Sequence, residues 1–242
     1  MPSANKLTMY FRMTFSPVRT FAELSEQPPE PWLALGWMLL FRVPLSWAAN
    51  AIGYAWIAQA QRIINNPNPE LLDFIGRFTD QADSALYELQ RLPSLPPLGV
   101  AWLWLGLLAL LGVIGLWMHN VAWDHTALWM LQGTKPKPSL RFSCAAIAEA
   151  MGAASLGSLL GLLATIPVAG LLLLPVISFA NIFYWGLRGV SLAAYHNCPI
   201  WKGVAATALH LLLAVVFYGL AFLLSGLLIV TIMLILFPNQ NC

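Results

Sequence analysis

The sequence predicts an all-α integral membrane protein with about five transmembrane helices, and three observations support this fold class. Of the 242 residues, 59% are hydrophobic and only 9% are charged, whereas soluble domains average about 25% charged residues. The mean hydropathy is +0.71. Several apolar runs reach the roughly 20 residues that cross the hydrocarbon core of a bilayer. So few charges cannot coat a soluble surface, so we expect a membrane domain.

The leader, residues 1–30, is expected to place an amphipathic helix on the membrane surface. The stretch "TFSPVRTFAELSEQ" offers Ser16 as an N-cap and Pro17 as the first helical residue. The neighbouring "MYFRMTF" supplies aromatic residues and methionines that suit the interface. No signal peptide is predicted, because the first strongly apolar run begins only near Trp32.

One membrane domain, residues 31–236, is expected to hold all the spans and to end in a short tail, 237–242. The predicted spans are 31–54, 98–123, 145–166, 169–192 and 204–236. Pro167 and Gly170 interrupt the apolar tract between the third and fourth spans and predict a tight helical hairpin. The fifth span exceeds the bilayer thickness, so it must tilt or project.

The loop between the first two spans, residues 55–97, is expected to contain another amphipathic helix. Its stretch "PELLDFIGRFTDQADSALYELQRL" places apolar residues at helical spacing on one face and acids on the other. Such a helix either caps the bundle or forms a docking surface.

The distribution of cationic residues predicts the orientation. Eight lysines and arginines fall in or beside the leader and the second and fourth connections, and three fall in the loop 55–97. Cytoplasmic loops carry the excess of positive charge. The N-terminus is therefore expected in the cytoplasm and Cys242 outside.

Arg42 and Glu149 stand out among the ionisable residues of the predicted spans. Arg42 is near the centre of the first span, where an arginine costs about 2.5–3.5 kcal/mol, so it needs a partner or a route to water. Glu149 in the third span is the expected partner, because the guanidinium stem can reach toward it. Two interpretations stay open: an ion pair that sets helix register, or a proton or ligand site. Asn181 adds a polar group to the fourth span.

The stretch "WMHNVAWDHTALW" places His119, Asp124 and His125 at the end of the second span. The two histidines are six residues apart, about 120° around the helix axis, so they cannot bind one ion together. A haem held by histidines of different spans, for example His119 and His210, is an alternative. We favour histidines that are exposed to water at the interface, and expect neither metal nor cofactor.

No catalytic motif is present, so no enzymatic activity is predicted. The stretch "GAASLGSLLG" instead carries Ala153, Gly157 and Gly161 at a spacing that favours close helix packing. The three cysteines lie too far apart for a zinc or redox motif. A net charge of +2 without a basic run gives no reason to expect nucleic-acid binding.

The order of these features resembles the Yip domain family of multispanning membrane proteins, especially its bacterial members. The resemblance covers about residues 10–235 and is carried by "SPVRTFAEL", "LQGTKPKPSLRFSCAAIAEAMGAASL" and "LLATIPVAGLLLLPVISFANIFYWGLRGVSLAAYHNCPIWKGVAAT". It implies a five-span fold and a bacterial inner membrane. Eukaryotic members are associated with vesicle trafficking and Rab-type GTPases, but the chain lacks their acidic-Leu-Tyr-Gly-Pro motif. Rab binding is therefore not expected, and most bacterial members have no assigned activity.

The sequence favours a non-catalytic scaffold or accessory subunit that binds other integral membrane proteins, as part of a larger complex, or organises membrane lipids. Two alternatives remain. One is a transporter or channel-like protein that uses Arg42 and Glu149, since carriers place charges and broken helices near the midplane. The other is a haem- or quinone-associated subunit that uses the histidines.

Overall fold

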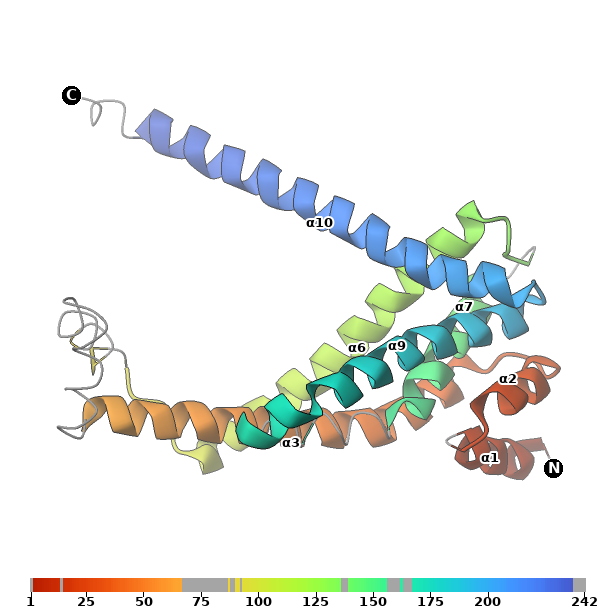
Figure 1. The fold of residues 1–242 in the computed structure, drawn as a ribbon, viewed down its shortest axis with the longest axis horizontal. Coiled ribbons are helices and arrows are strands. Elements are labelled where there is room, and N and C mark those ends of the chain that lie inside the picture. The colour runs from red at the N-terminus through yellow and green to blue at the C-terminus, as the bar shows by residue number, and fades with distance from the viewer. Residues whose placement is uncertain are drawn as a thin grey trace. The chain divides into compact units, whose positions relative to one another are not determined.

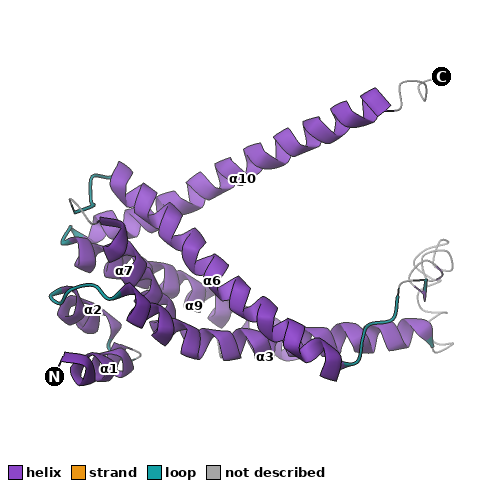
Figure 2. Ribbon diagram, turned by 180° about the vertical axis from the view of Figure 1, so that it is seen from behind, coloured by secondary structure: helices purple, strands orange, loops and turns teal. Residues whose placement is uncertain are grey.

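The fold was established in a computed structural model of the chain (Figure 1). The structure describes residues 2–13, 15–66, 87, 90–91, 93–135, 139–155, 162 and 167–236. These residues form helices joined by turns, with no strand among them, as Figure 2 shows. The prediction of an all-α chain is confirmed for this part of the molecule.

Within the described residues, four helices are long and apolar enough to cross a membrane. They are α3 (Pro31–Asn65), α6 (Leu98–Met130), α9 (Pro167–His196, of which Leu172–His196 qualifies) and α10 (Ile200–Leu236, of which Ile200–Ile229 qualifies). Each contains one predicted span and extends beyond it. In α3 the extension is largest, because the polar segment after residue 54 stays helical up to Asn65. The start of the predicted loop 55–97 is therefore helix.

Two other predicted elements lie largely outside the described residues. The amphipathic helix of the loop 55–97 falls almost entirely on undescribed positions. The third predicted span is described only at its start, in α7 (Ser139–Ala153). The predicted turn at Pro167 and Gly170 is not found there, since both residues belong to α9, which begins at Pro167. A proline suits this first helical position, because its missing N–H would have no intrahelical partner there.

The chain divides into two compact units. The first contains residues 1–38, 116–154 and 180–242, and the second contains 39–115 and 155–179. In the first unit, α1 (Pro2–Met13) packs against α2 (Pro17–Ser25), and both contact α7 (Figure 1). The helix α2 begins at Pro17, as predicted, although the Ser16 side chain makes no capping hydrogen bond. Helix α1 was not predicted; Met9, Tyr10 and Met13 bury one of its faces.

A tight turn joins α9 to α10 in the first unit. Asn197 adopts a left-handed conformation, with φ of 52°. The N–H of Cys198 donates to the carbonyl of Ala193, and that of Asn197 to the carbonyl of Ala194. This pattern ends many helices, and asparagine tolerates the left-handed position better than most residues. It returns the chain so that the start of α10 packs against the end of α9.

Two glycines let these helices touch through their backbones. A Cβ added at Gly189 would lie 2.6 Å from Cα of Val204, and one added at Gly203 would overlap the carbonyl oxygen of Gly189. Small residues allow such close approach between membrane helices. The contact brings the polar residues of α9 and α10 into reach of one another.

Candidate functional site

Four buried polar side chains from three candidate spans meet inside the first unit. Asn120 and Asp124 are one turn apart on α6 and therefore share a face. Arg188, next to Gly189, projects from α9, and His210, two turns after Gly203, projects from α10. None of the four is more than 3% exposed. We call these four residues, with His119 and Tyr218, the buried network.

The centre of the network is a bidentate ion pair. Nε of Arg188 donates to Oδ2 of Asp124 at 2.9 Å, and Nη2 donates to Oδ1 at 2.6 Å. Nη1 donates to Oδ1 of Asn120 at 3.0 Å. The guanidinium also lies over the ring of Trp185, with Cζ 4.8 Å from the centroid. Parallel hydrogen bonds of this kind are among the strongest that side chains make.

A row of hydrogen-bonding rings leads from the ion pair to an exposed hydroxyl. Nδ1 of His210 lies 2.6 Å from Oδ1 of Asp124, and its Nε2 lies 3.2 Å from Nε2 of His119. Nδ1 of His119 lies 3.0 Å from the hydroxyl of Tyr218. Tyr218 is 51% exposed. The row therefore connects a fully buried carboxyl with the surface of the first unit.

The hydrogen bonds of this row can point in either of two directions. In one arrangement Tyr218 donates to His119, His119 donates through Nε2 to His210, and His210 donates through Nδ1 to Asp124. In the other, His210 donates through Nε2 to His119, His119 donates through Nδ1 to Tyr218, and Nδ1 of His210 accepts a hydrogen bond, from Asp124 only when that carboxyl is protonated. Nη2 of Arg188 lies 2.9 Å from this Nδ1 and is a donor for the reversed arrangement. Both arrangements keep the imidazoles neutral, as a proton relay requires.

A second cluster lies where α6, α7 and α9 meet in the first unit. The Ser143 hydroxyl is 2.8 Å from Nδ1 of His125 and 2.9 Å from Nε2 of His196. The backbone N–H of Lys135 donates to Nδ1 of His196 at 3.1 Å. Nε2 of His196 therefore carries the proton and donates to Ser143, which in turn donates to His125. Ser143 is fully buried, so its hydroxyl ties the three helices together.

Glu149 accepts hydrogen bonds from two tyrosines of the first unit. Tyr195 donates to its Oε1 at 2.7 Å and Tyr10 at 3.4 Å. Burial and the neighbouring Glu149 carboxyl raise the pKa of the Tyr10 phenol, so it keeps its proton and remains a donor. These contacts anchor α1 to α7 and α9. The predicted partner Arg42 belongs to the other unit, and its pairing with Glu149 stays a prediction.

The remaining predicted residues have simpler environments. Asn181 is exposed on α9. Ala153 is 7% exposed; the rest of its predicted packing stripe, Gly157 and Gly161, lies outside the described residues. The preceding residue, Gly152, is closely packed, because a Cβ added there would lie 2.8 Å from the Trp37 ring. Gly170 lies in the first turn of α9 instead of in a connecting turn.

The interpretation of the histidines as residues exposed to water is wrong for His196 and His210, which are each 3% exposed. Their partners come from helices far away in the sequence, which spacing within one helix cannot reveal. His119 and His125, which were expected not to act together, lie in different clusters.

The geometry does not suit a haem between His119 and His210. Two axial imidazoles sit on opposite sides of the iron, and metal–nitrogen bonds of about 2.0–2.1 Å would separate their Nε2 atoms by roughly 4 Å. The observed separation is 3.2 Å, which leaves no room for a porphyrin. Among the described residues, no group of three or more His, Cys, Asp or Glu could hold a metal ion.

Arg188 and Tyr218 were missed as members of a site. Arg188 stands within the fourth predicted span, and the cost that demands a partner for Arg42 applies to it equally. The cost of burying Arg188 predicts an acidic partner at a similar depth, and Asp124 at the end of the second predicted span is such a residue. Tyr218 gave no such signal, because a tyrosine in a span is common.

Comparison with known proteins gave no match: no protein-family model, no curated protein and no solved structure matches the chain.

Proposed function

We propose that the chain is a proton-coupled membrane transporter in which the buried network takes up and releases the coupled proton. The observation that carries this proposal is the unbroken row from the exposed Tyr218 hydroxyl through His119 and His210 to Asp124. Ionisable residues inside membrane helices are expensive, and they mark proton relays and ion pathways in many membrane proteins.

The length of the row favours a carrier over a channel. His210 and Tyr218 are eight residues apart on α10, which corresponds to about 12 Å along the helix axis. The hydrocarbon core is about 30 Å thick. The row therefore covers less than half of the membrane, as expected for a proton site that is alternately exposed to the two sides.

Each proton that enters the row is balanced by one that moves on. A proton arriving at the Tyr218 oxygen releases the hydroxyl proton to Nδ1 of His119. The Nε2 proton of His119 then passes to Nε2 of His210, and the Nδ1 proton of His210 passes to Asp124. The result is a neutral Asp124 and a row whose hydrogen bonds all point the opposite way.

Protonation of Asp124 removes the negative partner of Arg188. An uncompensated buried charge costs several kcal/mol, so the protonated network favours a conformation in which Arg188 finds another partner or water. Because Asp124 lies on α6 and Arg188 on α9, the change acts on the packing of these two helices. Proton uptake is thereby coupled to a helix rearrangement.

Charge displacement after a pH jump tests this proposal without knowledge of the transported solute. Purified protein in liposomes on a solid-supported membrane is expected to give a transient current when the external pH falls. Tyr218→Phe lacks the hydroxyl at the exposed end and is expected to slow the current by about tenfold or more, as for other positioned proton-transfer groups. His119→Phe interrupts the row and is expected to abolish the current.

Tyr87→Phe is the matched control, because Tyr87 is also exposed, at 59%, and does not belong to the network. Its current is expected to equal that of the native protein. Equal currents for native protein and Tyr218→Phe, or a current that survives in His119→Phe, would contradict the proposed relay.

A scaffold or accessory subunit is the second candidate, and the exposed surface of α10 favours it. Beyond Tyr218, no residue of 219–229 is buried, and Phe222 is 80% exposed. Such an apolar surface suits lipid or the helix of another integral membrane protein. A native protein that gives no current in the pH-jump experiment would favour this second candidate over the transporter.

We propose the following arrangement of the whole chain. The third of five spans begins within α7 and continues over residues 145–166, and a hairpin then leads into α9. The excess of positive charge supports a cytoplasmic N-terminus and an external C-terminus. The resemblance to bacterial Yip domain proteins supports a bacterial inner membrane as the location.

A further inference from the structure

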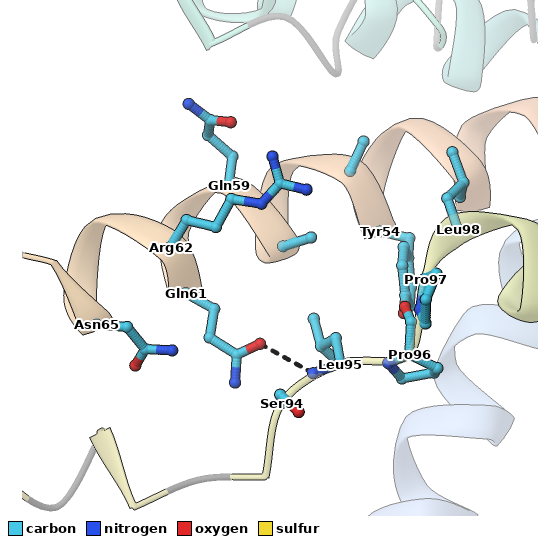
Figure 3. Close-up of a pocket in the computed structure, with 12 residues that line it drawn as sticks. Tyr54, Gln59, Gln61, Arg62, Asn65, Ser94, Leu95, Pro96, Pro97 and Leu98 are labelled. Carbon is cyan, nitrogen blue, oxygen red and sulfur yellow. Dashed lines mark hydrogen bonds between the residues drawn. The ribbon is translucent and has the colours of Figure 1, made fainter.

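A polar hollow lies within the second unit, between the end of α3 and the segment that leads into α6. Its volume is ≈480 Å³, within the range of about 300–1,000 Å³ that small-molecule sites occupy. One wall is the last three turns of α3, and the other is the segment 94–98. Figure 3 shows the residues that line it.

Hydrogen bonds hold the two walls together. The side chain of Gln61 donates from Nε2 to the carbonyl of Pro93 at 2.9 Å and accepts from the N–H of Leu95 at 3.0 Å (Figure 3). The hydroxyl of Tyr54 donates to the carbonyl of Pro96. Gln61 and Tyr54 are seven residues apart and therefore lie on the same face of α3. The hollow is thus preformed, since its walls are connected at both ends.

The adjacent face of α3 supplies donors that these bonds do not use. Gln59 and Arg62 are three residues apart and are neighbours on the helix surface, whereas Asn65 lies about 120° around the axis from Gln59. Their side chains make no hydrogen bond or ion pair with any residue that the structure describes. In Figure 3, Gln59 and Arg62 extend from α3 away from the Gln61–Leu95 bond. A cation with a neighbouring amide donor suits a ligand that carries an oxyanion.

Exposed tryptophans indicate the depth of the hollow in the membrane. Trp56 on α3 is 46% exposed, and Trp102 and Trp104 on α6 are 42% and 66% exposed. Tryptophan side chains concentrate at the membrane–water interface. Arg62 follows Trp56 by six residues, about 9 Å along the helix axis. The donors therefore lie just outside the tryptophans, in the layer of the lipid headgroups.

We propose that this hollow binds the headgroup of an anionic phospholipid, with the phosphodiester at Arg62 and the carboxamide of Gln59. The apolar side of the hollow, formed by Leu95, Pro97 and Leu98, faces the glycerol and the first carbons of the acyl chains. Free inorganic phosphate offers the same oxyanion but no apolar part. A lipid also reaches this depth without leaving the membrane, so we assign the site to the lipid. This assignment goes beyond the proposed transport function and does not depend on it.

Native mass spectrometry of the delipidated protein in detergent tests the assignment. Dioleoyl phosphatidylglycerol is expected to bind with about tenfold higher affinity to the native chain than to Arg62→Gln, which removes the charge and the planar donor fork. Arg91→Gln is the matched control, because Arg91 belongs to the same unit but does not line the hollow. Its affinity is expected to equal that of the native chain.

Binding of free phosphate and nonspecific attraction of the lipid to positive charge would each give a different result from the proposed site. A 100-fold molar excess of inorganic phosphate is expected not to displace the lipid, and displacement would overturn the assignment to a lipid. Equal affinities of native chain and Arg62→Gln would overturn the site itself. Equal losses of lipid affinity in Arg62→Gln and Arg91→Gln would show a general attraction of the lipid to positive charge. That result would also overturn the proposed site.

Discussion

Replacing Arg188 with leucine is expected to lower the free energy of unfolding by about 3–5 kcal/mol, the usual cost of leaving one partner of a buried ion pair alone. Asp124 is fully buried and would lose both of its hydrogen bonds to the guanidinium. Asn120 would lose a donor as well. Unfolding of the purified protein in mixed micelles by SDS measures the effect.

Two further variants separate the contribution of the ion pair to stability from the other effects of replacing Arg188. The double variant Asp124→Leu/Arg188→Leu removes both charges and is expected to recover at least half of the lost stability, since paired burial of apolar side chains often replaces a buried ion pair without loss. Arg12→Gln breaks an exposed pair with Glu23 and is expected to change stability by less than about 1 kcal/mol. A single variant Arg188→Leu as stable as Arg12→Gln would contradict the described ion pair.

Replacing Gly203 with alanine is expected to have the second large effect. The added Cβ would overlap the carbonyl oxygen of Gly189 and come within 2.9 Å of Cβ of Ala193. Both obstacles belong to α9, and a backbone carbonyl cannot turn away as a flexible side chain can. Overpacking costs typically about 1–3 kcal/mol and sometimes more, and we expect a value at or above the top of this range. The same SDS titration measures it.

Gly219→Ala is the matched control on the same helix. No atom of the part of the chain that the structure describes lies within 4 Å of a Cβ at this position. Alanine is also the better helix former by about 1 kcal/mol, so stability is expected to stay equal or to rise slightly. Equal effects of the two substitutions would contradict the close contact between α9 and α10.

The sequence predicts the fold correctly wherever the composition of a single segment is enough to identify a helix. Length and apolar composition suffice for a span, so each of the four helices that hold a candidate span contains a predicted one. Composition does not identify where a helix ends. The polar residues after position 54 contain no helix-breaking residue before Asn65, and α3 continues to that point. Helix α1 depends on tertiary packing: Tyr10 stacks on Trp37 and Met13 is fully buried. A short helix of that kind has little local signal.

The candidate site was predictable only in part. Asp124, His119 and His210 all stood out as polar residues near apolar runs. Their assembly into one network depends on which faces of α6, α9 and α10 turn toward each other, and that depends on the contact between Gly189 and Gly203. A single sequence shows the spacing within a helix but not the pairing between helices. For this reason the partner of Asp124, Arg188, was treated only as a positive charge beside a loop.

Infrared difference spectroscopy of the Asp124 carboxyl tests the central claim most directly, which is that a proton travels along the row to this residue. After a rapid fall in pH, the native protein in liposomes is expected to show the carbonyl band of a newly protonated carboxylic acid. This band is expected to be missing in Asp124→Asn and to be missing or strongly delayed in His119→Phe. A band that persists unchanged in Asp124→Asn, or that forms equally fast in His119→Phe, would contradict the account.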